Sequence, residues 1–241
     1  MTGNQIISNR QAVASISRIS LPQIDTWIFD LDNTLYPESC SLFDQVDRRM
    51  GLYIENLLGL DRISARALQK EYFREHGTTL RGLMTEHGID PRSYMDFVHE
   101  IDVSAITRDQ VLDRALSHLP GRKVIFTNAS ARHAENVMER LGVASHFSAV
   151  YDIVAAGYLP KPAPATYQNF ISAHGIDPAR AIFFEDTARN LEPAAAMGMT
   201  TVWIETYGNG SAQGAENDYV HHRTNDLAGW LSSLLPDTST P

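Results

Sequence analysis

Residues 24–34 read IDTWIFDLDNT, a short run of apolar, β-branched and aromatic side chains that ends at two aspartates, Asp30 and Asp32. A continuous apolar run of this length, bounded by polar residues, is typical of a strand buried on both faces, as in a parallel sheet. We therefore expect a central strand at 24–29 with two carboxylates just beyond its carboxyl end.

The segment from Ser41 to about Leu119 does not supply the neighbouring strand. Its apolar residues recur at spacings of three and four, which predicts helices rather than strands. The helices are expected to end at Gly59, Gly77 and Gly88, because glycine readily adopts the left-handed conformation that closes a helix. Nearly eighty residues without a strand indicate an insertion.

Strands and helices alternate from Lys123 onward. The predicted strands are 124–126, 150–154, 181–184 and 200–204, and the predicted helices are 131–141, 163–174, 191–197 and 227–235. Apolar strands that alternate with helices predict an α/β fold, a doubly wound, Rossmann-like parallel sheet, with a helical cap inserted after the first strand. The expected domains are a flexible tail (1–22), an α/β core (23–36 and 119–241) and a helical cap (37–118).

Composition excludes several classes of protein. A chain of 241 residues can bury a sizeable core, and one cysteine, Cys40, cannot form an internal disulfide, so a reducing, cytoplasmic location is expected. The formal net charge of -9 disfavours polymeric nucleic acid as a partner, and the absence of a long apolar run disfavours a membrane span. The first 24 residues lack Asp and Glu and faintly resemble an organelle transit peptide, although a flexible tail is the simpler interpretation.

Polar groups follow four of the predicted strands, at the edge of the sheet where ligands of such folds bind. They are Asp30 and Asp32, Thr127-Asn128, Lys161 in the loop after 150–154, and Glu185-Asp186. Alone, each has an ordinary explanation, as a turn, a helix cap or a solvated surface group. An EF-hand loop is disfavoured because residues 35 and 41 are Leu and Ser rather than Gly and Glu. Together the four groups indicate one site.

These four motifs, in this order, resemble those of the haloacid dehalogenase-like (HAD) superfamily of phosphohydrolases. The resemblance spans residues 24–204 and implies that Asp30 is the nucleophile and Asp32 the general acid and base. It implies a Mg²⁺ ion held by the Asp30 carboxylate, the Asp32 carbonyl and Asp186, with Glu185 close by. It also implies that Thr127, Asn128 and Lys161 bind the phosphoryl group.

The residue types suit that chemistry, because phosphoryl transfer depends on positioning and on neutralising oxygen charge. Two carboxylates facing a phosphate dianion would repel it unless a divalent cation and a group such as Lys161 counter them. Asp32 also disfavours a dehalogenase reaction, because the true dehalogenases of the superfamily lack the second aspartate. A phosphonatase would need a lysine in the insert, and Lys70 is the one candidate there.

Further stretches resemble the pyrimidine 5'-nucleotidase subgroup. They are Asp30–Pro37, His76–Leu83, Glu86–Asp90, Val98–Asp102 and Phe184–Leu191. This resemblance implies a nucleoside monophosphate such as UMP or CMP as substrate, a small-molecule phosphate ester, with Thr78 and Thr79 as candidate specificity residues. His76 departs from the subgroup, in which a tyrosine often precedes the Gly-Thr-Thr-Leu stretch. A phosphatase of phosphoglycolate or a sugar phosphate, a phosphomutase, and a non-catalytic binding module remain alternatives.

Overall fold

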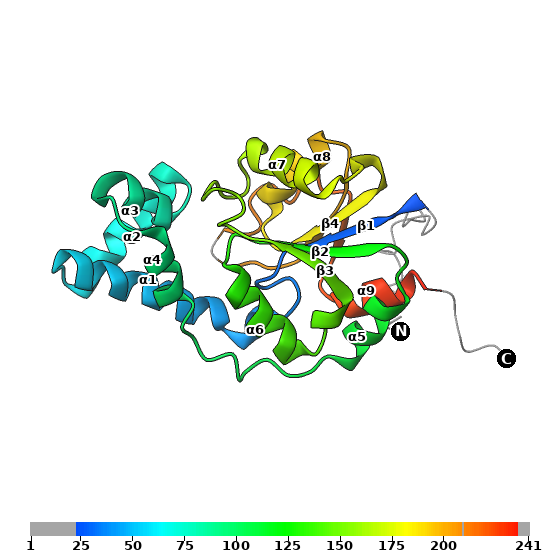
Figure 1. Ribbon diagram of the computed structural model, residues 1–241, viewed down its shortest axis with the longest axis horizontal. Coiled ribbons are helices and arrows are strands. Elements are labelled where there is room, and N and C mark those ends of the chain that lie inside the picture. Colours follow the sequence, from blue (N-terminus) through cyan, green and yellow to red (C-terminus); the bar gives the residue numbers. More distant parts are fainter. Residues whose placement is uncertain (1–22, 209, 236–241) are drawn as a thin grey trace, which may run out of the picture.

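The computed structural model describes residues 23–208 and 210–235, and its centre is a parallel sheet (Figure 1). The six strands lie in the order β3-β2-β1-β4-β5-β6, and every pairing is parallel. They are β1 (Thr26–Phe29), β2 (Arg122–Phe126), β3 (Phe147–Tyr151), β4 (Ala181–Glu185), β5 (Thr200–Ile204) and β6 (His222–Thr224). This confirms the predicted doubly wound fold. The order reverses beside β1, so the crevice for a ligand is expected at the carboxyl end of that strand.

Helices cover both faces of the sheet (Figure 1). One face carries α5 (Gln110–His118), α6 (Ala131–Leu141) and α9 (Leu227–Ser233), and the other carries α7 (Pro164–His174) and α8 (Leu191–Ala196). Successive side chains of β1 point to opposite faces, so Phe29 packs in the cluster of α5, α6 and α9 while Ile28 packs in that of α7 and α8. Burial on both faces explains the continuous apolar run of β1. Short 3₁₀ helices lie at Glu38–Cys40, Ala144–His146, Pro178–Arg180 and Ala188–Asn190.

Four helices between β1 and β2 form a separate bundle beside the carboxyl edge of the sheet (Figure 1). They are α1 (Leu42–Leu58), α2 (Arg62–His76), α3 (Thr79–His87) and α4 (Pro91–Val98), and Gly59, Gly77 and Gly88 close the first three as predicted. The bundle has its own apolar cluster, in which Ile54, Leu83 and Val98 are fully buried. Helices α2 and α3 approach so closely that a Cβ on Gly82 would lie 2.4 Å from the Tyr72 Cβ.

Helix α5 packs with the core rather than with this bundle. Its residues Leu112, Ala115 and Leu116 are buried in the cluster that includes Phe29 and Leu231 of the core. A long connection leads from the end of α4 back to α5 (Figure 1). We therefore propose that the cap comprises residues 42–98, a narrower range than the 37–118 expected from the sequence.

Two strands differ from their sequence-based expectations. β3 ends at Tyr151 because Asp152 begins a turn, in which its carboxylate accepts hydrogen bonds from the Ala131 and Ala155 N–H groups. Ile153, whose apolar character extended the predicted strand to 154, instead packs in the cap cluster. The short edge strand β6 was not predicted, because its residues His222–Thr224 carry no apolar signal.

No helix within residues 23–208 and 210–235 is both long enough and apolar enough to span a membrane. The tail predicted at 1–22, and with it the faint resemblance to a transit peptide, lies outside the described residues.

Candidate active site

The carboxyl edge of the sheet brings together side chains that are far apart in the sequence. Asp30 follows β1, Glu185 ends the adjacent strand β4, and Asp186 follows it. Lys161 comes from the loop between β3 and α7 and lies among them. All four side chains are buried. Strand pairing therefore places the predicted groups in one site.

Lys161 bridges two of the carboxylates. Its Nζ donates to Asp30 Oδ1 at 2.7 Å, to Glu185 Oε2 at 2.6 Å and to the Phe126 carbonyl oxygen at 2.8 Å. Burial lowers the pKa of Lys161, but the charges of Asp30 and Glu185 outweigh it and hold that pKa above its ordinary value. The ammonium is therefore a fixed positive charge at the bottom of the site.

Asp30, Glu185 and Asp186 form an acidic cluster that suits a divalent cation. One carboxylate oxygen from each lies within 4.8 Å of the others. Burial and the charge of Glu185 raise the pKa of Asp30 to about 7, and burial with the charges of Glu185 and Asp30 raises the pKa of Asp186. One ammonium does not balance three buried carboxylates, and hard oxygen ligands suit Mg²⁺. These residues fit the metal site that the family resemblance implies.

Asp32 lies beside this cluster and is held by two other residues. Its Oδ1 accepts hydrogen bonds from the Tyr36 hydroxyl at 2.5 Å and from His133 Nε2 at 2.8 Å. Burial raises the pKa of Asp32, but the His133 charge and the hydrogen bonds from His133 and Tyr36 outweigh it, so that the pKa falls to about 2. The side chain is therefore an ionised carboxylate at neutral pH.

Sequence reasoning missed His133. It lies in the first turn of α6, is 1% exposed, and stacks on His99 with ring centroids 4.6 Å apart. The one available signal was a polar residue on the otherwise apolar buried face of α6, which Ala134, Val137 and Leu141 complete. That pattern does not reveal which group the imidazole meets.

Thr127 and Asn128 are placed at the same edge of the sheet. The Thr127 hydroxyl oxygen accepts a hydrogen bond from the Ala129 N–H at 3.0 Å. The Asn128 side chain holds the backbone of Lys161, accepting from its N–H at 2.8 Å and donating to its carbonyl oxygen at 3.3 Å. Phosphate binding by Thr127 and Asn128 stays a prediction, but the Asn128 amide already serves to position Lys161.

The acidic cluster opens into a cavity of about 340 Å³ between core and cap. Core residues Asp30, Asp32 and Lys161 line it, and α1 to α4 supply apolar and aromatic lining. These cap residues are Phe43, Val46, Met50, Phe73, Leu80, Tyr94, Met95 and Val98. The cap therefore supplies most of the apolar lining of this cavity.

Thr78 and Thr79 both line the cavity, but each also has a structural role. The Thr78 hydroxyl oxygen accepts from the Arg81 N–H at 3.1 Å and caps α3. The Thr79 hydroxyl donates to the Gln69 carbonyl oxygen at 3.3 Å. Their assignment as specificity residues stays a prediction.

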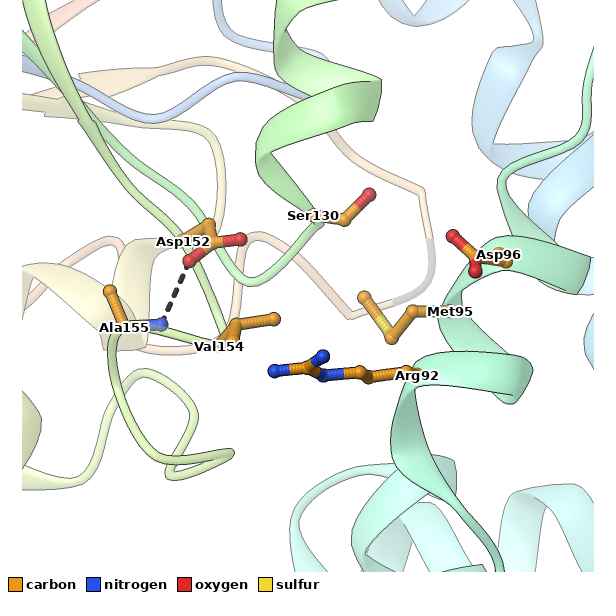
Figure 2. Close-up of a pocket in the computed structure, with 7 residues that line it drawn as sticks. All are labelled: Arg92, Met95, Asp96, Ser130, Asp152, Val154 and Ala155. Atoms are coloured by element: carbon orange, nitrogen blue, oxygen red, sulfur yellow. Dashed lines mark hydrogen bonds between the residues drawn. The ribbon is translucent and has the colours of Figure 1, made fainter.

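A second cleft, of about 510 Å³, separates α4 from the core (Figure 2). Arg92, Met95 and Asp96 lie on its α4 side, opposite Ser130 and Asp152, and the Arg92 side chain extends across it (Figure 2). The cleft lies beside contacts that join cap and core, since Met95 packs in the same apolar cluster as Ile153.

Comparisons with known proteins agree with this geometry. A family model described as "Hydrolase: haloacid dehalogenase-like hydrolase" matches residues 24–198, from just before β1 to just after α8. Phosphate metabolism protein 8 of Saccharomyces cerevisiae is 28% identical over 206 residues, a match that covers 77% of this chain. The match covers 64% of that relative, so the chain spans less than two thirds of its length.

Solved structures share the fold at low sequence identity. A HAD phosphatase from Thermococcus onnurineus superposes with a TM-score of 0.59 at 17% identity, covering 88% of this chain and 98% of that one. The L-2-haloacid dehalogenase RSc1362 gives a TM-score of 0.54 at 18% identity, with the same coverage of 88% and 98%. Because a phosphatase and a dehalogenase match alike, the fold does not distinguish their reactions. The family match over residues 24–198 establishes that the chain belongs to the haloacid dehalogenase-like hydrolases.

Proposed function

We propose that this protein is a Mg²⁺-dependent phosphatase that hydrolyses pyrimidine nucleoside 5'-monophosphates through an aspartyl-phosphate intermediate. The observation that carries the proposal is the pair Asp30 and Asp32 at the cavity floor. Asp30 is held by Lys161 at 2.7 Å, and Asp32 is a second carboxylate held separately by His133. One carboxylate can serve as nucleophile while the other transfers protons.

In the first step, an Asp30 carboxylate oxygen attacks phosphorus and forms an acyl phosphate. The ester P–O bond breaks, its electron pair goes to the leaving oxygen, and that oxygen takes a proton from Asp32. In the second step, water attacks the same phosphorus and gives a proton to Asp32. The bond between phosphorus and the Asp30 oxygen breaks, its electron pair returns to that oxygen to restore the carboxylate, and inorganic phosphate leaves. Lys161 supplies positive charge beside the phosphoryl oxygens, and the Thr127 hydroxyl binds one of them, through both steps.

Asp32 must carry a proton for the first step, although its pKa is about 2 in the free protein. A phosphate dianion beside it raises that pKa, because a nearby like charge disfavours the carboxylate. Proton uptake by Asp32 is therefore expected to accompany substrate binding.

A Mg²⁺ ion bound by Asp30, Asp186 and the Asp32 carbonyl, with Glu185 close by, would polarise the phosphoryl oxygens and neutralise their charge. The support for it is the buried acidic cluster described above. The presence of Asp32 favours phosphate transfer over dehalogenation, because the true dehalogenases of the superfamily lack this second aspartate. Lys70 lines the cavity, but its Nζ is in an ion pair with Asp47 at 3.6 Å, which leaves a Schiff-base role without support.

The nucleotide assignment rests on the subgroup resemblance and on the cavity. A volume of about 340 Å³ lies within the range of about 300–1,000 Å³ that is usual for small-molecule sites. Phe43 and Phe73 provide aromatic surface for a base. The name of the yeast relative links that protein to phosphate metabolism.

A panel of phosphate esters tests the substrate. We expect UMP and CMP to be hydrolysed with kcat/KM at least about 10-fold above phosphoglycolate and sugar phosphates, a ratio within the reach of a shaped pocket. Phosphate release measures it. If the protein hydrolyses another ester but neither UMP nor CMP, the nucleotide assignment is wrong and the substrate is a different metabolite. Isomerised product with little free phosphate would indicate a mutase.

Removing divalent cations tests the metal. We expect EDTA to lower turnover by at least about 100-fold, and added Mg²⁺ to restore it, because charge neutralisation by the ion contributes several kcal/mol. Mg²⁺ is also expected to raise the unfolding temperature of the wild type but not of Asp186→Asn, since a ligand stabilises the state that binds it. Equal activity with and without EDTA would contradict a metal-dependent reaction.

A further inference from the structure

We propose that His133 is a positioning residue, which together with Tyr36 turns the Asp32 carboxylate so that its Oδ2 performs the proton transfers. The inference rests on the proposed phosphatase function and deepens it. It assigns a role to an imidazole that is far from Asp32 in the sequence and that touches none of the groups in the acidic cluster by hydrogen bond.

Both hydrogen bonds to the Asp32 side chain converge on the same oxygen. Tyr36 donates its hydroxyl proton to Oδ1 at 2.5 Å, and His133 Nε2 reaches Oδ1 at 2.8 Å. The carboxylate only accepts, so the proton lies on Nε2. Two donors occupy the lone pairs of Oδ1. Among the described residues, Oδ2 has no side-chain or backbone donor, and it is the oxygen left to meet the leaving group.

The position of His133 is itself fixed by packing. Ser130 caps α6 and accepts from the His133 N–H at 3.4 Å, which sets the first turn of the helix. The imidazole is 1% exposed and lies nearly parallel to His99, at an interplanar angle of 16°. His99 follows the last cap helix, and its Nδ1 lies 3.2 Å from the Ser130 hydroxyl. The His133 imidazole is therefore held in place by α6, to which it belongs, and by His99, which follows α4.

Proton transfer is sensitive to such placement, because the acid must lie within hydrogen-bond reach of the leaving oxygen. Without His133, the Tyr36 hydroxyl is the one remaining side-chain donor to Asp32 among the described residues, and a single hydrogen bond lets the carboxylate turn about its terminal torsion. It then presents either oxygen, in a wider range of directions. In kcat/KM, which reports the steps up to departure of the leaving group, the loss should appear only where the leaving group needs a proton.

Two esters separate this role from a general loss of structure. The leaving group of an alkyl phosphate such as UMP, or of the best alkyl ester of the panel, departs as an alcohol and needs a proton from Asp32. The leaving group of p-nitrophenyl phosphate departs as a stabilised phenolate and needs no proton. In His133→Phe, we expect kcat/KM for the alkyl ester to fall about 10- to 100-fold, part of the usual contribution of a general acid, and that for p-nitrophenyl phosphate to change less than about 3-fold.

His133→Gln keeps an amide N–H that can reach Asp32, and it should recover most of the alkyl-ester activity. Tyr36→Phe removes only a hydroxyl from a buried ring and should show the same selective loss. This variant tests the proposal if His133→Phe folds poorly. His146→Phe is the matched control, because His146 forms a comparable pair with Asp113 at 2.6 Å and neither residue lines the cavity.

An equal loss for both esters in His133→Phe and Tyr36→Phe, or no loss in either, would overturn the positioning role while leaving the phosphatase intact. Failure of the wild type to hydrolyse any ester, or full activity of Asp30→Asn, would instead refute the proposed function itself. The two failures are therefore distinguishable in one set of assays.

Discussion

Asp30→Asn is expected to lose at least about 10⁴-fold in turnover of every phosphate ester that the wild type hydrolyses, because an amide cannot attack phosphorus as a carboxylate does. Stability should change little or rise, since the substitution removes one of three crowded buried carboxylates. The measurements are phosphate release and detection of a covalent phosphate adduct by mass spectrometry, with the adduct present in the wild type only.

Asp25→Asn is the matched control for charge. Asp25 precedes β1 at the opposite edge of the sheet from Asp30, and its carboxylate pairs with Arg180 at 2.7 Å on the surface. Activity of that variant should equal that of the wild type. Turnover by Asp30→Asn within 10-fold of wild type would rule out Asp30 as the nucleophile.

Lys161→Met is expected to lose about 100- to 1,000-fold in turnover and, in metal-free buffer, about 3–5 kcal/mol in the free energy of unfolding. The reason is the burial of its two partners: Asp30 and Glu185 would remain side by side without the ammonium between them. Urea denaturation followed by circular dichroism measures the stability loss.

The stability deficit should grow as the pH rises. The folded-state pKa of Asp30 is already raised to about 7, from an ordinary 3.8, and loss of Lys161 raises it further. Between these values the folded state binds more protons than the unfolded state, so the free energy of unfolding falls with increasing pH. Lys161→Met should therefore be closer to wild type at pH 5 than at pH 8.

Two further variants isolate the cause. Lys123 is also buried, but its Nζ binds the carbonyl oxygens of Leu119 and Gly121 rather than carboxylates, so Lys123→Met should keep its activity and show no such pH trend. Adding Glu185→Gln to Lys161→Met removes one of the repelling charges and should recover about 1–3 kcal/mol. An unchanged stability in Lys161→Met at pH 8 would show that the three groups are not electrostatically coupled.

The fold could be predicted to a large extent because its signals are local. A strand buried on both faces, such as Thr26–Phe29, favours a nearly continuous run of β-branched and aromatic residues, and Gly59 closes α1 because glycine readily adopts the left-handed conformation. The exceptions have the same kind of explanation. Ile153 is apolar because it packs against the cap, and this long-range contact made a turn resemble the end of a strand.

The core of the candidate site was also accessible from the sequence. Parallel strands expose their carboxyl ends at one edge, so polar residues after successive strands must lie near one another. Asp30, Lys161, Glu185 and Asp186 meet as this rule predicts. Their catalytic roles come from the family resemblance and await the experiments above.

The order of strands, helices and strand-end groups was thus encoded in local patterns along the chain. Tertiary packing alone decided which partner each group meets. No pattern along the sequence reveals such a partner, because the contacting segments are distant in the chain, as with His133 and Asp32, Asn128 and Lys161, and α5 and α9. The residue types in the sequence therefore indicated the kind of reaction. The direction in which each side chain acts depends on packing between segments that the sequence keeps apart.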